Sequence, residues 1–392
     1  MAEPTGSPAH VAVDMLPPDP PPFEPYKAEF FQKSDGDIVS HDTHLNTDGE
    51  ALYRFLLEQS AAYPKYTLHC RGTHTETRTR IVRTTINGTS SMRTETYTET
   101  ITDFNFHVDF SSQIVAGPVH WSLADDEPAY RGLMVRQVQA PQGRRKATKE
   151  EIKSFKAREH YRHDKGLPPW IDPDGTDHLA VLQSSQTLRQ WADEYCASPK
   201  ILKEFLYEKF VHGWDIAALE TAVRAAIAET GYQGRIHVSF NLSGTKIFVR
   251  PDNKLSRMLS KTWVKCLLML FLIYPFIWLF KRFNSKGGGR WEVCGGAYGF
   301  KHVDSVRDGD KEVGETSAKA EFPALRSGVE SRFVQTDTGP VTVYGLREGE
   351  WFKKWEYTIK QSAINHLQRS DPIMDLGDVP SYAARALDGY TG

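Results

Sequence analysis

A run of nineteen residues near the middle of the chain constrains the fold more than any other feature. Residues 262–280 read TWVKCLLMLFLIYPFIWLF and contain a single charge, that of Lys265. As one helix the run would be about 28 Å long, which is close to the hydrocarbon thickness of a thin membrane. Core helices of soluble domains rarely contain so long an apolar run. The sequence therefore predicts a membrane anchor at 262–280, with a buried core helix as the alternative.

The ends of this run carry residues that are typical of a membrane interface. Trp263 and Trp278 lie near the two ends, and Lys265 is close enough to one edge for its ammonium to reach the headgroups. We predict that the anchor comprises Trp263, Lys265, Leu268, Phe271, Ile273, Tyr274, Pro275, Trp278 and Phe280, and that anionic lipid is contacted by Arg257, Lys261, Lys281 and Arg282.

Two membrane topologies remain open from the sequence. Basic residues flank both ends of the run, so the positive-inside rule gives no orientation. Tyr274-Pro275 fits a bend in a spanning helix, and it also fits the turn of a shallow hairpin that leaves both flanks in the cytosol. We favour one transmembrane helix with the N-terminal body in the cytosol, because the first thirty residues lack a signal-peptide pattern. The expected location is the endoplasmic reticulum or another endomembrane.

Outside this run the composition is that of a soluble globular chain. The 392 residues include 48 Lys and Arg against 50 Asp and Glu, and the near balance argues against a surface built to bind nucleic acid. Four cysteines exclude a disulfide scaffold. The Pro-rich, acidic segment 1–28 predicts a disordered tail, and its PxxP patterns at 17–20 and 22–25 fit an SH3-like partner.

The pattern of apolar residues predicts an α+β fold in which an antiparallel sheet packs against helices. A capping box at 47–50 precedes a helix, and threonines alternate with charged residues on both sides of the turn signal Asn87-Gly88. Folding about this turn should bring Arg78 and Arg80 near Glu95 and Glu99. We expect the β-rich part of the domain to span 29–142.

The following segments predict further helices. Residues 143–185 hold an exposed basic helix, capped by Thr148 and Glu151, and a linker; this helix fits an anionic membrane face, an acidic partner or a solvated surface. Residues 186–250 should complete the domain. They predict a helix with an apolar stripe over 188–195, further helices at 199–213 after the Ser198-Pro199 start signal and at 216–231 after Asp215, and then a β-hairpin at 236–250.

The C-terminal region, 285–392, predicts a strand at 341–344, an amphipathic helix at 349–369 and a disordered tail from Asp371. The helix carries an apolar stripe every fourth residue. It suits packing against the rest of the protein, and an interfacial position on a membrane is the alternative. The stripe consists of Trp351, Trp355, Ile359, Ala363 and Leu367.

No catalytic or metal-binding pattern stands out, so we predict no cofactor and no metal. The histidine pairs at 41 and 44 and at 160 and 163 lack the partners of a metal site. An enzyme site assembled from His107, Asp109 and His120 is the alternative to a binding function.

Four stretches carry a resemblance to a known group of proteins. DGEALYRFLL at 48–57, CRGTHTETRTR at 70–80, YTETITDFNFHVDFS at 97–111 and IYPFIWLFKRF at 273–283 together resemble an uncharacterised fungal family of membrane-anchored proteins with one central hydrophobic segment. The resemblance implies this layout and no activity. The anchor, the Pro-rich tail, the basic helix and the missing catalytic pattern lead us to expect a membrane-anchored adaptor or scaffold whose partners are membrane lipid and protein rather than nucleic acid.

Overall fold

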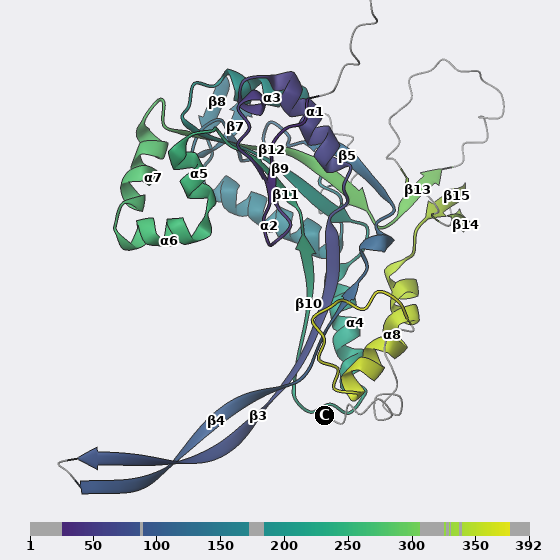
Figure 1. Cartoon of the computed structure of the whole chain (residues 1–392). Coiled ribbons are helices and arrows are strands. Elements are labelled where there is room, and N and C mark those ends of the chain that lie inside the picture. The colour runs from purple at the N-terminus through teal and green to yellow at the C-terminus, as the bar shows by residue number, and fades with distance from the viewer. Residues whose placement is uncertain are drawn as a thin grey trace, which may run out of the picture.

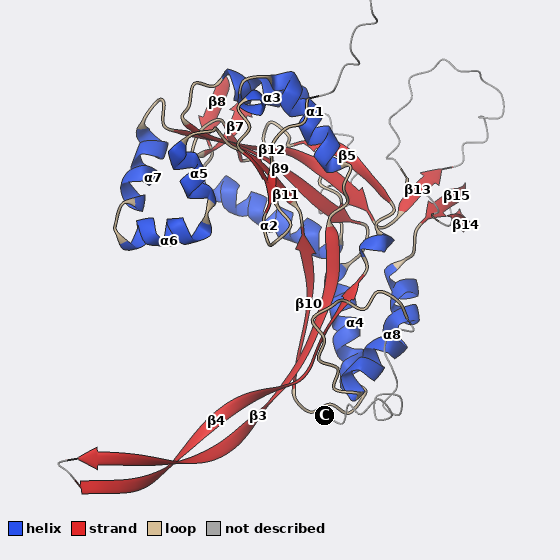
Figure 2. Ribbon diagram, viewed as in Figure 1, coloured by secondary structure: helices blue, strands red, loops and turns tan. Residues whose placement is uncertain are grey.

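The computed structural model describes residues 26–86, 89–171, 184–305, 325–326, 329, 331–336 and 339–376. Within these ranges the chain combines a nine-stranded sheet, two three-stranded sheets and helices that cover them (Figures 1 and 2). The α+β class predicted from the sequence is confirmed at this level. The segment 1–25, with the PxxP patterns, and the segment 377–392 lie outside the described residues.

The nine-stranded sheet forms the centre of the molecule. Its strands follow the order β1 (Phe31–Gln32), β2 (Ile38–Ser40), β11 (Lys246–Val249), β9 (Leu202–His212), β12 (Gly288–Gly299), β6 (Ala129–Arg131), β7 (Arg136–Ala140) and β8 (Gly143–Lys146), and β5 (Ala116–Ser122) also pairs with β12. β9 pairs antiparallel with β11 and parallel with β12. Helices α1 (Gly49–Ser60) and α3 (Leu188–Ala197) bury their apolar stripes with side chains from β9, β11 and β12.

The central strand β9 replaces the helix that the sequence predicted at 199–213, so that prediction is wrong. Phe205 and Tyr207 are fully buried in one core cluster, and Leu206 is buried as well, so apolar contacts lie on both sides of the strand. The signals Ser198-Pro199 and Gly213 border the strand instead of a helix. Pairing with two neighbouring strands decides the outcome, because it satisfies the backbone along the whole segment.

A second layer packs below the large sheet. The strands β10 (Arg235–Ser243), β3 (Lys65–Ile86) and β4 (Thr89–Asp109) form a three-stranded sheet, and α4 (Ile216–Ala228) and α8 (Glu348–Ile364) supply apolar side chains to its core. Phe110 lies at the centre of this core, where its ring contacts Trp214, Phe300 and Trp351. The packing role predicted for α8 is confirmed, because Trp351 and Ile359 are fully buried in this core.

Two predictions about chain connection are corrected by the strand pairing. β10 and β11 do not form the hairpin expected at 236–250, because β10 pairs with β3 in the small sheet and β11 joins β2 and β9 in the large one. The tail expected from Asp371 does not begin at that residue. Ile373 is buried, and its N–H donates to the carbonyl of His107 at 2.7 Å along β4.

The remaining elements lie around these layers. They are the 3-10 turns η1 (His44–Asn46) and η2 (Ser111–Gln113), the basic helix α2 (Lys149–Lys165), the sheet of β13 (His302–Ser305), β14 (Ser331–Thr336) and β15 (Gly339–Tyr344), and the helices α5 (Lys254–Ser260), α6 (Thr262–Leu270) and α7 (Tyr274–Phe283). The capping box of α2 and the strand at 341–344 are confirmed, and Asp215 caps α4 as expected. The cap of α1 is Asp48, one residue later than expected.

Beyond the small sheet, β3 and β4 continue as a two-stranded ribbon that projects from the body (Figure 1). β10 accompanies β3 only as far as Thr73. The ribbon has one face of paired threonines and one charged face, on which Arg78 lies 2.8 Å from Glu99 and Arg80 lies 3.2 Å from Glu95. The predicted cross-strand ion pairs are confirmed.

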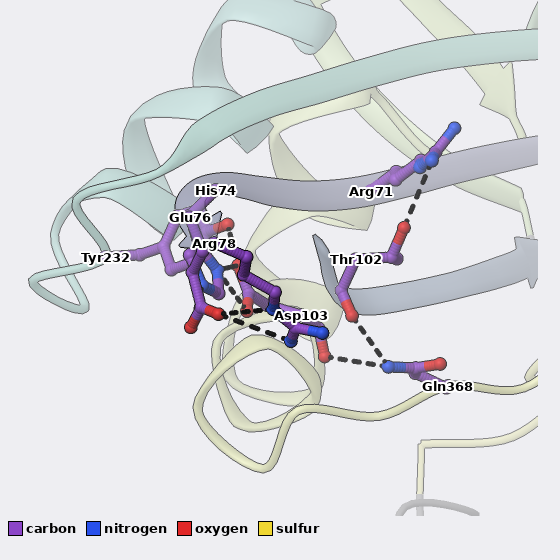
Figure 3. A network of polar contacts seen from close by, with 8 residues as sticks. All are labelled: Arg71, His74, Glu76, Arg78, Thr102, Asp103, Tyr232 and Gln368. Carbon is purple, nitrogen blue, oxygen red and sulfur yellow. Dashed lines mark hydrogen bonds and ion pairs between the residues drawn. The ribbon is translucent and has the colours of Figure 1, made fainter. Parts of the chain in front are cut away.

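A polar network fixes the ribbon where it leaves the small sheet (Figure 3). A β-bulge opposite Gly72 and Thr73 leaves Asp103 unpaired in the ladder, and its carboxylate accepts bonds from the Tyr232 hydroxyl at 2.5 Å and from His74 Nδ1 at 2.7 Å. The Gln368 amide donates to the neighbouring backbone carbonyl of Thr102 at 2.8 Å. The root of the ribbon is therefore held by two other segments of the chain, those of Tyr232 and Gln368.

We expect the ribbon to be separable from the body. Replacing residues 77–98 by an Asn-Gly turn should change the free energy of unfolding by less than about 0.5 kcal/mol, because beyond its root the ribbon pairs only with itself. Asp103→Ala at the root should cost about 1–2 kcal/mol, because it removes the acceptor of two hydrogen bonds. Urea unfolding measures both; equal losses would contradict this division.

Candidate membrane-docking site

The apolar run folds as two helices and not as one. α6 ends at Leu270, α7 begins at Tyr274, and their axes differ by 100°. Leu272 between them has a positive φ of 57°, and Pro275 in the first turn of α7 lacks the N–H that a continuing helix would need. The transmembrane helix predicted at 262–280 is therefore not confirmed. Among the described residues no single helix is long and apolar enough to cross a membrane, although this bent pair passes by length and composition together.

Both ends of the segment formed by α5, α6 and α7 meet at the same residue of the body. The Asn253 side chain, which caps α5, donates to the carbonyl of Ile201 at 2.8 Å. The N–H of Ile201 donates to the carbonyl of Lys286 at 3.0 Å, just after α7. The chain thus leaves the large sheet after β11 and returns to it as β12, with β9 hydrogen-bonded between the two strands.

The outer surface of this α5–α7 segment is strongly apolar. Its large apolar side chains are between 41% and 75% exposed, whereas soluble monomers rarely expose more than a few hundred Å² of continuous apolar surface. They are Trp263, Leu267, Met269, Leu270, Phe271, Leu272, Ile273, Phe276, Trp278, Leu279 and Phe283. The exposed apolar side chains therefore come from α6, from α7 and from the break between them.

Polar contacts hold the segment against the sheet on its inner side. Ser260 at the end of α5 is bonded to His41 Nε2 at 2.8 Å and accepts from Arg250 Nη1 at 2.9 Å. Arg282 near the end of α7 donates to the carbonyl of Met134 at 3.1 Å, and its guanidinium lies over the ring of Trp278. The segment is thus attached to the body at both of its ends.

A cavity of about 90 Å³ lies between this segment and the sheet, and we call it the basic cavity. Its walls come from all three helices and include Ser256, Lys265, Tyr274, Trp278 and Lys281, and strand β9 and the residue after β11 contribute Glu204 and Arg250. Its lining is therefore apolar toward the helices and charged toward the sheet.

Glu204 organises the charges at the sheet side of the basic cavity. Arg250 donates to it at 2.6 Å, and Arg290 Nε lies 3.7 Å from its other oxygen. Burial raises the pKa of Glu204, but the positive charges of Arg250, Arg290 and Lys281 and the bond from Arg250 outweigh burial and hold the pKa below its ordinary value. Glu204 is therefore ionised at neutral pH and fixes both guanidinium groups.

The residues predicted for the anchor and for lipid contact have divided roles. Trp263, Phe271 and Ile273 are exposed on the outer surface with Pro275, whereas Leu268 and Phe280 are half-buried. Trp278 is partly exposed and also lines the basic cavity with Lys265, Tyr274 and Lys281. Of the remaining basic residues, Arg257 pairs with Asp252, Arg282 bonds to the backbone, and Lys261 is exposed.

The residues of the alternative enzyme site belong to different sheets. His107 on β4 stacks on the ring of His69, and Asp109 accepts bonds from Ser111 in a local turn. His120 lies on β5 of the large sheet and is bonded to the Tyr207 hydroxyl at 2.8 Å. Asp109 and His120 thus have separate partners, whereas Nδ1 of His107 is buried without a hydrogen-bond partner among the described residues. Among the described residues, no group of three or more metal-ligating side chains converges on one point.

Sequence reasoning missed Glu204 because the surrounding residues were assigned to a helix. A helical pattern gives Glu204 no particular neighbour, whereas on β9 Lys203 and Glu204 point to opposite faces. Only the aromatic and β-branched content of the segment favoured a strand.

No protein-family model, curated protein or solved structure shows significant similarity to this chain.

We expect Glu204→Gln to destabilise the protein by about 2–3 kcal/mol at pH 7, because it leaves two guanidinium groups without their carboxylate. The pKa of Glu204 is lowered on folding, so its contribution is complete above the unfolded pKa of about 4.3 and is lost as the pH falls through the folded pKa. The difference from wild type should therefore shrink in urea titrations below about pH 4.

The control is Glu208→Gln on the same strand, which removes only a surface pair with Lys246 and should cost under about 0.5 kcal/mol. A similar loss of stability in both variants would contradict the role of Glu204.

Proposed function

We propose that this chain is a monotopic membrane protein that inserts the bend of α6 and α7 into one leaflet and acts there as a binding adaptor. The observation that carries the proposal is the combination of an exposed apolar bend with two ends that meet at Ile201. Burying these side chains in lipid would remove them from water at a gain of about 25 cal/mol for each Å². The proposal adopts the hairpin that the sequence left open.

A single membrane crossing is difficult to reconcile with the strand order. β11 precedes the apolar run and β12 follows it, yet both are hydrogen-bonded to β9. A crossing would put β11 and β12 on opposite sides of the membrane and would require one of these ladders to break. Insertion into one leaflet keeps the large sheet intact and needs no change in the body.

The same geometry supports a cytosolic position for the body. If both flanks lie on one side, their basic residues act together, and a cluster of Lys and Arg beside a membrane segment favours the cytosolic face. The cluster comprises Lys254, Arg257, Lys261, Lys281, Arg282 and Lys286. An endomembrane location remains the proposal that accompanies this orientation.

An adaptor role is supported by the ribbon of β3 and β4. It extends from the body while its outer edges beyond Thr73 stay unpaired, and such edges can accept a strand from a partner. The basic helix α2 offers a second surface, since most of its lysines are exposed. One part of the molecule would thus hold lipid while others remain available to proteins.

Vesicle flotation tests the docking surface. Wild-type protein should float with phosphatidylcholine vesicles, and Leu270→Glu with Phe276→Glu should not, because each carboxylate in hydrocarbon costs about 2–3 kcal/mol. Both side chains are exposed, so the fold should not change. The control variant is Ile81→Glu with Met92→Glu on the ribbon. These two side chains are as exposed as Leu270 and Phe276, and the control variant should float like wild type. Unchanged flotation of the α6–α7 variant would refute the proposed docking surface.

Cysteine labelling tests the topology. Lys254→Cys and Lys286→Cys lie on the two flanks, and each can be placed in a chain whose Cys196 and Cys266 are replaced by serine. In sealed microsomes a membrane-impermeant maleimide added to the cytosolic side should label both positions equally. The sequon at Asn241 should remain unglycosylated. Labelling of one flank only after permeabilisation would establish a single crossing instead.

A further inference from the structure

The basic cavity contains more positive charge than its own residues neutralise. Arg250 is paired with Glu204, but the lysines that enter from α6 and α7 have no comparable partner. Within the part of the chain that the structure describes, the side chains of Lys265 and Lys281 form no hydrogen bond and no ion pair, although the charge of Glu204 attracts both. Two lysines from separate helices therefore line one small space that contains a single carboxylate.

Lys203 does not add to this excess, although its chain lines the cavity. Its ammonium points to the opposite face of β9, where it donates to the carbonyls of Asn46, Tyr195, Cys196 and Ser198 at 2.8–3.1 Å. The charged groups of the cavity are therefore Arg250, Lys265, Lys281 and Glu204, with a net charge of +2 (three positive, one negative). Such an excess is costly in a partly desolvated site unless an anion neutralises it.

The cavity is large enough for a small anion. It offers about 90 Å³, several times the roughly 10–15 Å³ of accessible space that one water molecule needs. A phosphate group can therefore enter it. The hydroxyls of Ser256 and Tyr274 also line the cavity and can donate to phosphate oxygens.

The position of the cavity indicates where the phosphate would come from. Its walls carry Ile277 and Trp278 from α7, the helix whose outer side exposes Phe276 and Leu279. A ligand that entered between the helices would therefore have a charged end at β9 and an apolar remainder beside the exposed bend. A lipid with a small phosphorylated headgroup has this distribution of charge and apolar surface.

We propose that the basic cavity binds the phosphate of a lipid whose headgroup is a bare phosphomonoester, such as phosphatidic acid. Lys265, Lys281 and Arg250 neutralise the dianion, and Glu204 orients Arg250 through the ion pair between them. The inference rests on the proposed insertion of α6 and α7, and it adds selectivity for one lipid class. Lys265 thus contacts a headgroup through a defined site and not by reaching the nearest membrane edge.

Vesicles of matched surface charge test this selectivity. Wild-type protein should prefer phosphatidylcholine vesicles containing phosphatidic acid over those containing phosphatidylserine, and salt that screens surface attraction should not abolish the preference. Lys265→Met with Lys281→Met should lower affinity for phosphatidic acid vesicles by about tenfold per lysine and leave binding to neutral vesicles unchanged. The melting temperature of this variant should be equal to or above that of wild type, because two unpaired charges are removed.

The control carries the same change in charge outside the cavity. Lys261→Met with Lys286→Met removes two exposed lysines from the flanks and should keep the preference for phosphatidic acid. Equal losses of preference in the two double variants would overturn the proposed site and assign the effect to diffuse surface charge. Equal binding of wild type to all vesicles would overturn it as well while leaving membrane docking intact, and failure to bind any vesicle would reject docking itself.

Calorimetry with inorganic phosphate and with glycerol 3-phosphate separates a lipid from a soluble source. Weak binding of both, with strong binding to the vesicles, supports the lipid. A different result would overturn the lipid source: one of these phosphates binds tightly, and the Lys265→Met with Lys281→Met variant loses this binding without changing its vesicle preference. The cavity would then be a site for a soluble phosphate.

Discussion

The hydrogen bonding of β9 to β11 on one side and to β12 on the other is the constraint on which the rest of the structure depends. Everything between these two strands, including the apolar run, must leave the sheet and return to the same place. The far end of β12 then continues into the second layer, where Tyr298 and Phe300 join the core around Phe110. One strand triplet therefore connects the helical segment, the large sheet and the small sheet.

Charged residues on this central strand have to be satisfied individually, because burial of an unpaired charge is costly. Lys203 on one face binds backbone carbonyls near the end of α3, and this contact connects the helix to the sheet. Glu204 on the other face holds Arg250 and Arg290. The alternation of a strand thus gives neighbouring residues separate tasks: one stabilises the fold, and the other prepares the basic cavity beneath the bend of α6 and α7.

Local features of the fold were predictable where short-range physics decides them. The Thr148 capping box, the Asp215 cap and the cross-strand pairs of Arg78 and Arg80 depend on residues that are close in sequence or related by one turn. The helix expected at 199–213 and the hairpin expected at 236–250 failed for the opposite reason. Their end signals were compatible with either structure, and pairing with distant strands chose between them.

By itself, the sequence determined that this chain has one long apolar segment with basic flanks, a charged β-ribbon and an α+β body, because these follow from composition and periodicity. Only the tertiary structure decided that the apolar segment bends by 100° and returns to Ile201. It also brought Lys265, Lys281, Arg250 and Glu204 to one cavity. These arrangements depend on strands far apart in the chain, and no local pattern of residues encodes which strands will pair.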